Sequence, residues 1–178
     1  MAEEKKEPWL NYLALSTVIF AVCATLSTFK GGGFSTRSVM SQTQASDQWA
    51  YFQAKSIKSY LYQMQAEKME LELSSLSTTA PASIVAGYQG KIADYKKKTD
   101  KYEKEKSEIQ QEAKRLEAVR DDTQRHAQIF GIAVIYLQIA ILMSSIAALL
   151  KKRPVWFAGV AAGIVGLVYF ADGFLLFL

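Results

Sequence analysis

The chain has 178 residues, half of them apolar, and a formal net charge of only +4. This small positive excess gives no reason to expect nucleic acid as a partner. A single cysteine, Cys23, excludes an internal disulfide bond. The single histidine, His126, has none of the partners that would complete a metal site. We therefore expect no structural metal and no disulfide framework.

The charged residues are segregated along the chain. Three windows are almost free of charge, and the stretch between the first two is strongly charged. A globular domain mixes both kinds of residue on the period of its helices and strands, whereas a membrane-spanning helix needs about 20 consecutive apolar residues. The pattern predicts an all-α membrane protein, in which three transmembrane helices carry one long antiparallel, coiled-coil-like helical hairpin between the first and the second.

Residues 1–8 form a short charged segment, which we expect in the cytoplasm, and residues 9–29 form the first predicted transmembrane helix. Trp9 and Tyr12 suit an anchor at the level of the lipid headgroups. A cleaved signal peptide is the alternative, but the apolar run is long for one. We interpret this segment as an uncleaved membrane anchor.

Residues 30–35 contain three consecutive glycines, Gly31, Gly32 and Gly33. Glycine loses much conformational entropy in a helix, so we expect the first helix to end or bend at this glycine hinge. Ser35 and Thr36 follow and are suited to cap a new helix.

Residues 36–126 are predicted to form the extramembrane hairpin, with arms at 36–77 and 84–126. The breaker cluster Ser77–Ser83, which contains Pro81, separates two arms of nearly equal length. Apolar residues at steps of three, four or seven, interrupted on the first arm by Lys68, indicate the seam along which the arms pair. On the first arm these residues are Ala50, Ala54, Ile57, Leu61, Met64 and Leu71, and on the second arm they are Ile92, Tyr95, Tyr102, Ile109, Ala113 and Leu116.

The second run has no internal stop, so we predict one helix from Ile84 to Leu150, with its second transmembrane segment at 127–150. A basic turn at 151–154 precedes the third predicted span, 155–178. Three positive charges in so short a turn, Lys151, Lys152 and Arg153, favour a cytoplasmic position. The N-terminus is then cytoplasmic too, and the hairpin lies on the opposite, periplasmic side.

Three groups of residues within the spans are candidate sites. Asp172 is the only acidic residue in any span, and we predict an interhelical ion pair that it makes with Lys30 and Arg125. Gln138 is a polar residue near the middle of the second span, where it is suited to bond across helices or to line a path. Gly159, Gly163 and Gly166 form a small ridge on which another helix, of this chain or of a neighbour, can pack closely.

The sequence contains no phosphate-binding loop, no dinucleotide glycine pattern and no nucleophile motif. We therefore predict no catalytic residues, no cofactor and no enzymatic activity. A basic run toward the hairpin tip, Lys96 to Lys98, is interleaved with acidic residues and fits a solvated helix face.

The block Asp47 to Lys58, DQWAYFQAKSIK, resembles the signature of a family of small bacterial membrane proteins that is known only as a domain of unknown function. The resemblance extends over most of the chain, from an anchor helix that begins at Trp9 to a paired hydrophobic C-terminus. It implies a bacterial inner-membrane location and no activity or site residues.

We therefore expect a non-enzymatic, homo-oligomeric membrane protein with a structural or scaffolding role, whose hairpins project from the bilayer. One alternative is a small channel or transporter with a path lined by Gln138 or Asp172. Another is a sensor or recruiting subunit, with a protein partner at the hairpin tip.

Overall fold

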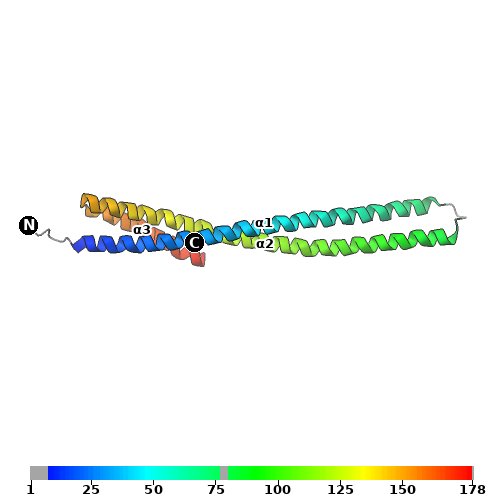
Figure 1. The fold of residues 1–178 in the computed structure, drawn as a ribbon, viewed down its shortest axis with the longest axis horizontal. Helices are drawn as coiled ribbons and strands as arrows, with labels where there is room; N and C mark the ends of the chain where they lie inside the picture. Colours follow the sequence, from blue (N-terminus) through cyan, green and yellow to red (C-terminus); the bar gives the residue numbers. More distant parts are fainter. Residues whose placement is uncertain (1–7, 77–79, 178) are drawn as a thin grey trace, which may run out of the picture. The chain divides into compact units, whose positions relative to one another are not determined.

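A computed structural model describes residues 8–76 and 80–177, which form three helices and no strand. Helix α1 spans Pro8–Ser75, α2 spans Ala82–Leu150 and α3 spans Arg153–Leu175 (Figure 1). The single helix expected from Ile84 to Leu150 is present as α2. The predicted breaker cluster lies where α1 ends and α2 begins, although residues 77–79 lie outside the described part.

Of the two outcomes expected at the glycine hinge, an end of the first helix or a bend in it, the end is wrong, because α1 continues through Gly31, Gly32 and Gly33 as an α-helix. Three glycines cost about 1 kcal/mol each relative to alanine, which a long helix with packed faces on either side can offset. Gly31 also serves packing, since a β-carbon there would lie 3.0 Å from the Cβ atom of Phe130.

The chain divides into two compact units. The first, here called the bundle unit, comprises residues 8–40 and 119–177, and the second, the hairpin unit, comprises residues 41–118. Helices α1 and α2 each contribute one segment to the bundle unit and another to the hairpin unit, whereas α3 belongs to the bundle unit alone.

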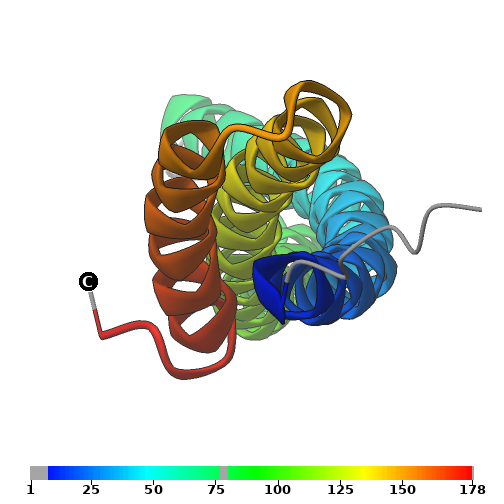
Figure 2. The same ribbon diagram turned by 90° about the vertical axis from the view of Figure 1, so that its left-hand side faces the viewer.

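In the bundle unit the three helices pack around two apolar clusters. Figure 2 shows the three helices end-on. One cluster is centred on Phe20, Ala24, Leu137 and Ala140, and the other on Trp9, Leu13 and Ala147. Small residues supply much of this interior, so the helix backbones approach one another closely.

The outer faces of the bundle unit are apolar as well. Large hydrophobic side chains point outward from all three helices, for example Leu15 (60% exposed), Leu142 (63%) and Phe157 (61%). A helix that is apolar on every side is typical of a membrane span, because water would not tolerate so large an apolar surface. Each of the three helices is long and apolar enough to cross a membrane.

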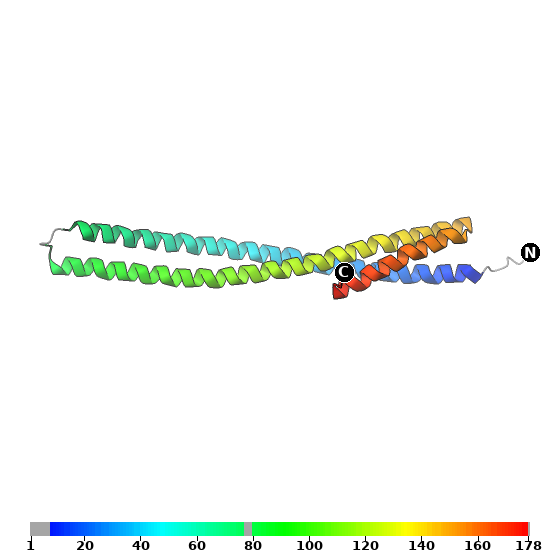
Figure 3. The same ribbon diagram turned by 180° about the vertical axis from the view of Figure 1, so that it is seen from behind.

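In the hairpin unit the two arms run antiparallel, as Figures 1 and 3 show. Side-chain contacts fix their register: Trp49 Nε1 donates to Glu117 Oε1 (2.9 Å). Further along, Lys55 pairs with Glu105 (2.6 Å) and Lys96 with Glu70 (2.7 Å). Residue numbers in these pairs rise on one arm as they fall on the other, as antiparallel helices require.

The predicted seam is correct on the second arm and wrong on the first. Ile92, Ile109, Ala113 and Leu116 are buried, whereas the first-arm stripe points away from the second arm. The inner face of the first arm instead carries small, polar and aromatic residues: Ala45, Phe52, Lys55, Ser59, Tyr62 and Ala66. The apolar period was real, but it marks a face that the described residues of this chain leave exposed.

This polar inner face predicts acid sensitivity in the hairpin unit. The hydrogen bond from Lys55 lowers the pKa of the Glu105 carboxyl group, and those from Lys106 and Ser59 lower the pKa of Glu103. A carboxyl group whose pKa is lower in the folded state than in the unfolded state stabilises the fold at pH values above its unfolded-state pKa. That stabilisation is lost as the pH falls through the folded-state pKa. We expect the thermal unfolding midpoint, followed by circular dichroism, to decrease when the pH is lowered below roughly 4.

Glu105→Gln should weaken this acid dependence, whereas Glu108→Gln, at an exposed position on the same arm, should leave it unchanged. Equal acid sensitivity in the wild type and in Glu105→Gln would contradict the assignment.

Candidate functional sites

The glycine ridge of α3 packs inside the chain. A β-carbon at Gly159 would lie 3.0 Å from Met143 Cβ on α2, and one at Gly166 would lie 2.8 Å from Leu137 Cγ. Gly163 faces the ring of Phe20 on α1 so closely that no β-carbon fits unless the ring moves. Gly173 lies against Phe130 in the same way.

The sequence left open whether this ridge contacts the same chain or a neighbour. All three predicted residues, Gly159, Gly163 and Gly166, are buried against α1 or α2 of the same chain. The ridge therefore builds the bundle unit, and its buried face is not available to a second copy.

Asp172 lies in the last turn of α3 and is only 1% exposed. Its Oδ1 atom accepts a hydrogen bond from the backbone N–H of Phe177 (2.6 Å), while its backbone carbonyl accepts one from Leu176 N–H (2.7 Å). Leu176 itself has a left-handed backbone conformation, with φ of 50°. The carboxylate thus helps to terminate the helix, a role that the sequence analysis did not foresee.

The predicted partners of Asp172 lie on exposed positions. Lys30 on α1 and Arg125 on α2 both have exposed side chains, in contrast to the buried carboxylate. Neither Lys30 nor Arg125 forms an ion pair within the described part of the chain, so the predicted pairing with Asp172 is not seen there and stays a prediction.

The sequence favours His126 as a polar residue at a membrane boundary rather than a metal ligand, and in the structure it joins α2 to both α1 and α3. Its Nδ1 atom lies 2.7 Å from the carbonyl oxygen of Gly173. A carbonyl oxygen can only accept, so Nδ1 carries the proton and donates. The imidazole also stacks on Phe34 at 4.5 Å between ring centroids, which gives contacts to α1 and α3 from one α2 residue. A lone histidine at the end of an apolar run carries no local signal for this role.

Gln138 occupies an exposed position on α2, so it points away from the interior of the bundle unit. Its neighbours Leu137 and Ala140 are fully buried. A polar side chain in the middle of an apolar window, facing outward, is costly in lipid unless it finds a partner.

Within residues 8–76 and 80–177, no group of three or more His, Cys, Asp or Glu residues is arranged to hold a metal ion. Cys23 is a free thiol, half-buried beside Phe20 and Leu137.

The fold and these sites define an all-helical protein with three helices long and apolar enough to cross a membrane. A family model described as a domain of unknown function, DUF4337, matches residues 9–176, and the chain belongs to this family. No curated protein and no solved structure matches the chain.

The packing of Gly163 against Phe20 gives a direct test of the bundle unit. Gly163→Leu should destabilise it by about 1–3 kcal/mol, because the added side chain overpacks the contact between α3 and α1. Thermal unfolding in detergent would measure the loss. Gly32→Leu is the control, since a β-carbon at Gly32 meets open space.

The double variant Gly163→Leu with Phe20→Ala should recover part of the lost stability, because removing the ring makes room for the leucine. A Gly163→Leu protein as stable as the wild type would show that α3 does not pack on α1 in this way.

Proposed function

We propose that this protein is a non-enzymatic, multi-pass membrane protein that assembles with copies of itself and projects a coiled-coil-like hairpin from the bilayer. Its three apolar helices would be transmembrane, at 9–29, 127–150 and 155–178. The resemblance carried by the block Asp47 to Lys58 supports the bacterial inner membrane as its location. The role would be structural or scaffolding.

One observation carries the self-assembly proposal: the first arm has an apolar stripe that the second arm does not cover. Ile57, Leu61, Met64 and Leu71 are 60%, 54%, 63% and 71% exposed. In a segment of the chain that is otherwise rich in charge, a stripe of large apolar side chains, interrupted by Lys68, indicates a protein interface. For brevity we call Ala50, Ala54, Ile57, Leu61, Met64, Lys68 and Leu71 the outer stripe.

A second copy of the chain is the occupant that best fits the outer stripe. Its residues alternate at steps of four and three over three heptads, which is the pattern that two parallel helices bury against each other. Copies inserted in one membrane with one topology present their stripes in parallel. Lys68 at one seam position is the kind of polar residue that fixes register and subunit number. Its own Glu72, 3.8 Å away, lies beside it to balance the charge.

Gln138 supports the same conclusion from the bundle unit. Because its side chain faces outward, a Gln138 in another copy would offer the donor and acceptor that lipid cannot. A path through a single chain receives less support, since the side chain of Gln138 is exposed on the outer face of the bundle unit and Asp172 bonds to the end of its own helix.

A recruiting role at the hairpin tip is a second candidate. A groove of about 250 Å³ lies near the tip and is lined by Met69, Ile84, Gly87, Tyr88 and Lys91. Apolar walls with one cation suit a short peptide that carries an acidic and an apolar residue.

Replacing the four large apolar residues of the outer stripe with glutamine should dissociate the assembly. Each buried side chain contributes about 1.5 kcal/mol or more, so the dissociation constant should rise at least about a thousandfold. Sedimentation or mass photometry in nanodiscs would measure the subunit number. The matched control replaces four exposed residues of the second arm with glutamine: Lys91, Lys97, Lys104 and Glu108.

The proposal predicts that the control variant keeps the subunit number of the wild type. A wild-type protein that is monomeric at every accessible concentration would refute self-assembly, whatever the variants do.

The proposed topology places the C-terminus and the hairpin on the side opposite the basic turn. A reporter that fluoresces only in the cytoplasm should therefore be dark when it is fused after Leu178. The same reporter fused after Arg153 should fluoresce, because the turn Lys151 to Arg153 is held in the cytoplasm by its charge. The reverse pair of results would place the hairpin in the cytosol.

A further inference from the structure

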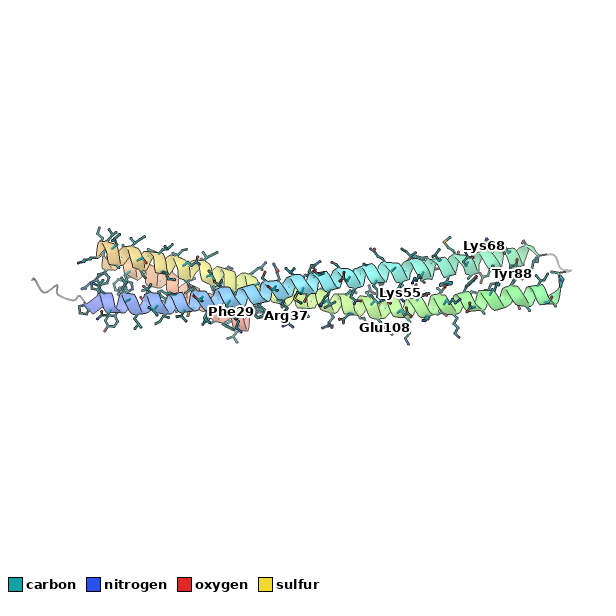
Figure 4. All side chains as sticks on the ribbon, viewed as in Figure 1. Phe29, Arg37, Lys55, Lys68, Tyr88 and Glu108 are labelled. Carbon is teal, nitrogen blue, oxygen red and sulfur yellow. The ribbon has the colours of Figure 1, made fainter. Side chains whose placement is uncertain are left out.

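One groove on the bundle unit gathers cations at the end of an apolar helix segment. It has a volume of about 330 Å³ and lies on the outer face of α1, where Phe29, Lys30, Gly33, Phe34 and Arg37 line it. Figure 4 labels Phe29 and Arg37 on this stretch of α1. We propose that this groove binds the phosphate group of an anionic phospholipid, an inference that rests on the proposed insertion of α1 in a membrane.

The geometry of the groove suits a ligand between two cations. Lys30, Gly33, Phe34 and Arg37 follow one another at helical steps, so they share one face of α1. Lys30 and Arg37 are about 10 Å apart along the helix axis, on either side of Gly33. A β-carbon at Gly33 would meet nothing within 4 Å, so the notch at its position is open. Two long cationic side chains can thus converge over a gap that is free to receive a ligand.

The charge of the groove favours an anionic ligand. Neither Lys30 nor Arg37 forms an ion pair within the described part of the chain, whereas other cations there, such as Lys55 and Lys96, do. Helix α1 also carries no acidic residue from Pro8 to Ser46. Both side chains are exposed, so two positive charges remain available to an anion from outside the chain.

The depth of the groove in the membrane favours a lipid over a soluble anion as its ligand. Lys30 is the first charge after the apolar run from Trp9 to Phe29, so it marks the level at which hydrocarbon gives way to headgroups. Phe29, 77% exposed, lies on the hydrocarbon side of it. Phe34 is held on the other side by its stack on His126. An acyl chain against Phe29 and a phosphate between Lys30 and Arg37 would occupy the groove together.

Each cation near an anionic headgroup is worth about a fivefold change in affinity, so the pair should contribute about 25-fold. The test uses native mass spectrometry of the full chain in detergent, with phosphatidylglycerol or phosphatidylcholine of identical acyl chains as the probe. We expect the wild type to bind phosphatidylglycerol preferentially, and Lys30→Gln with Arg37→Gln to lose about 25-fold in that affinity. Lys58→Gln with Lys104→Gln, at exposed hairpin positions, is the matched charge control.

A second variant separates the groove from charge alone. Gly33→Leu keeps both cations but fills the notch, so it should also weaken phosphatidylglycerol binding, whereas Gly32→Leu, which does not line this groove, should not. Glycerol phosphate in excess should fail to displace the lipid, because it has no acyl chain.

The outcomes distinguish this proposal from the proposed function. If the wild type inserts in phosphatidylcholine nanodiscs but shows no preference for phosphatidylglycerol, the headgroup site is refuted and membrane insertion stands. Displacement by glycerol phosphate would overturn the lipid as ligand in favour of a free phosphate. Failure to insert in any bilayer would overturn both proposals.

Discussion

The pairing of the two hairpin arms through a polar face determines what the rest of the hairpin unit can do. Lys55, with a side chain only 14% exposed, pairs with Glu105, and Ser59 donates to Glu103 at 2.6 Å. Tyr62 stacks on Tyr102 beside them, at 5.8 Å between centroids. These groups need particular partners, so only one face of α1 and one register satisfy them. The apolar side chains of the first arm must then point outward.

Close approach of the helix backbones has the corresponding role in the bundle unit. Lipid provides no hydrophobic force between helices, so packing at small residues is what holds membrane helices together. The absence of a side chain at three glycines lets a larger side chain pack directly against the α3 backbone. Gly163 contacts Phe20, Gly166 contacts Leu137 and Gly173 contacts Phe130, so the contacts follow one another along α3. The glycine ridge is thereby buried within the chain, whereas the side chain of Gln138 is exposed on the outer face of the bundle unit.

The sequence was sufficient to predict the helical class, the length of α2 and the buried face of the second arm, because these depend on composition and apolar period. It was not sufficient at Gly31 to Gly33, where local entropy argues for a break but packing of α1 on both sides prevails. Nor could it place His126, because its partner, the carbonyl oxygen of Gly173, lies 47 residues away and has no side-chain signature.

The first-arm seam shows why a correct period can lead to a wrong contact. The stripe from Ala50 to Leu71 has the stronger apolar signal, and the inner face has Lys55 and Ser59 where a seam would ordinarily be apolar. Periodicity identifies a face that needs covering, but it does not say which helix covers it. Polar pairs inside the hairpin give register more than stability, since burial of charge offsets much of their attraction. The outer stripe has the opposite balance, with large apolar side chains that supply affinity and a single polar residue, Lys68, that can set register. In the proposed assembly, the polar face would orient the arms and the outer stripe would join the copies, so each face would have a physical reason.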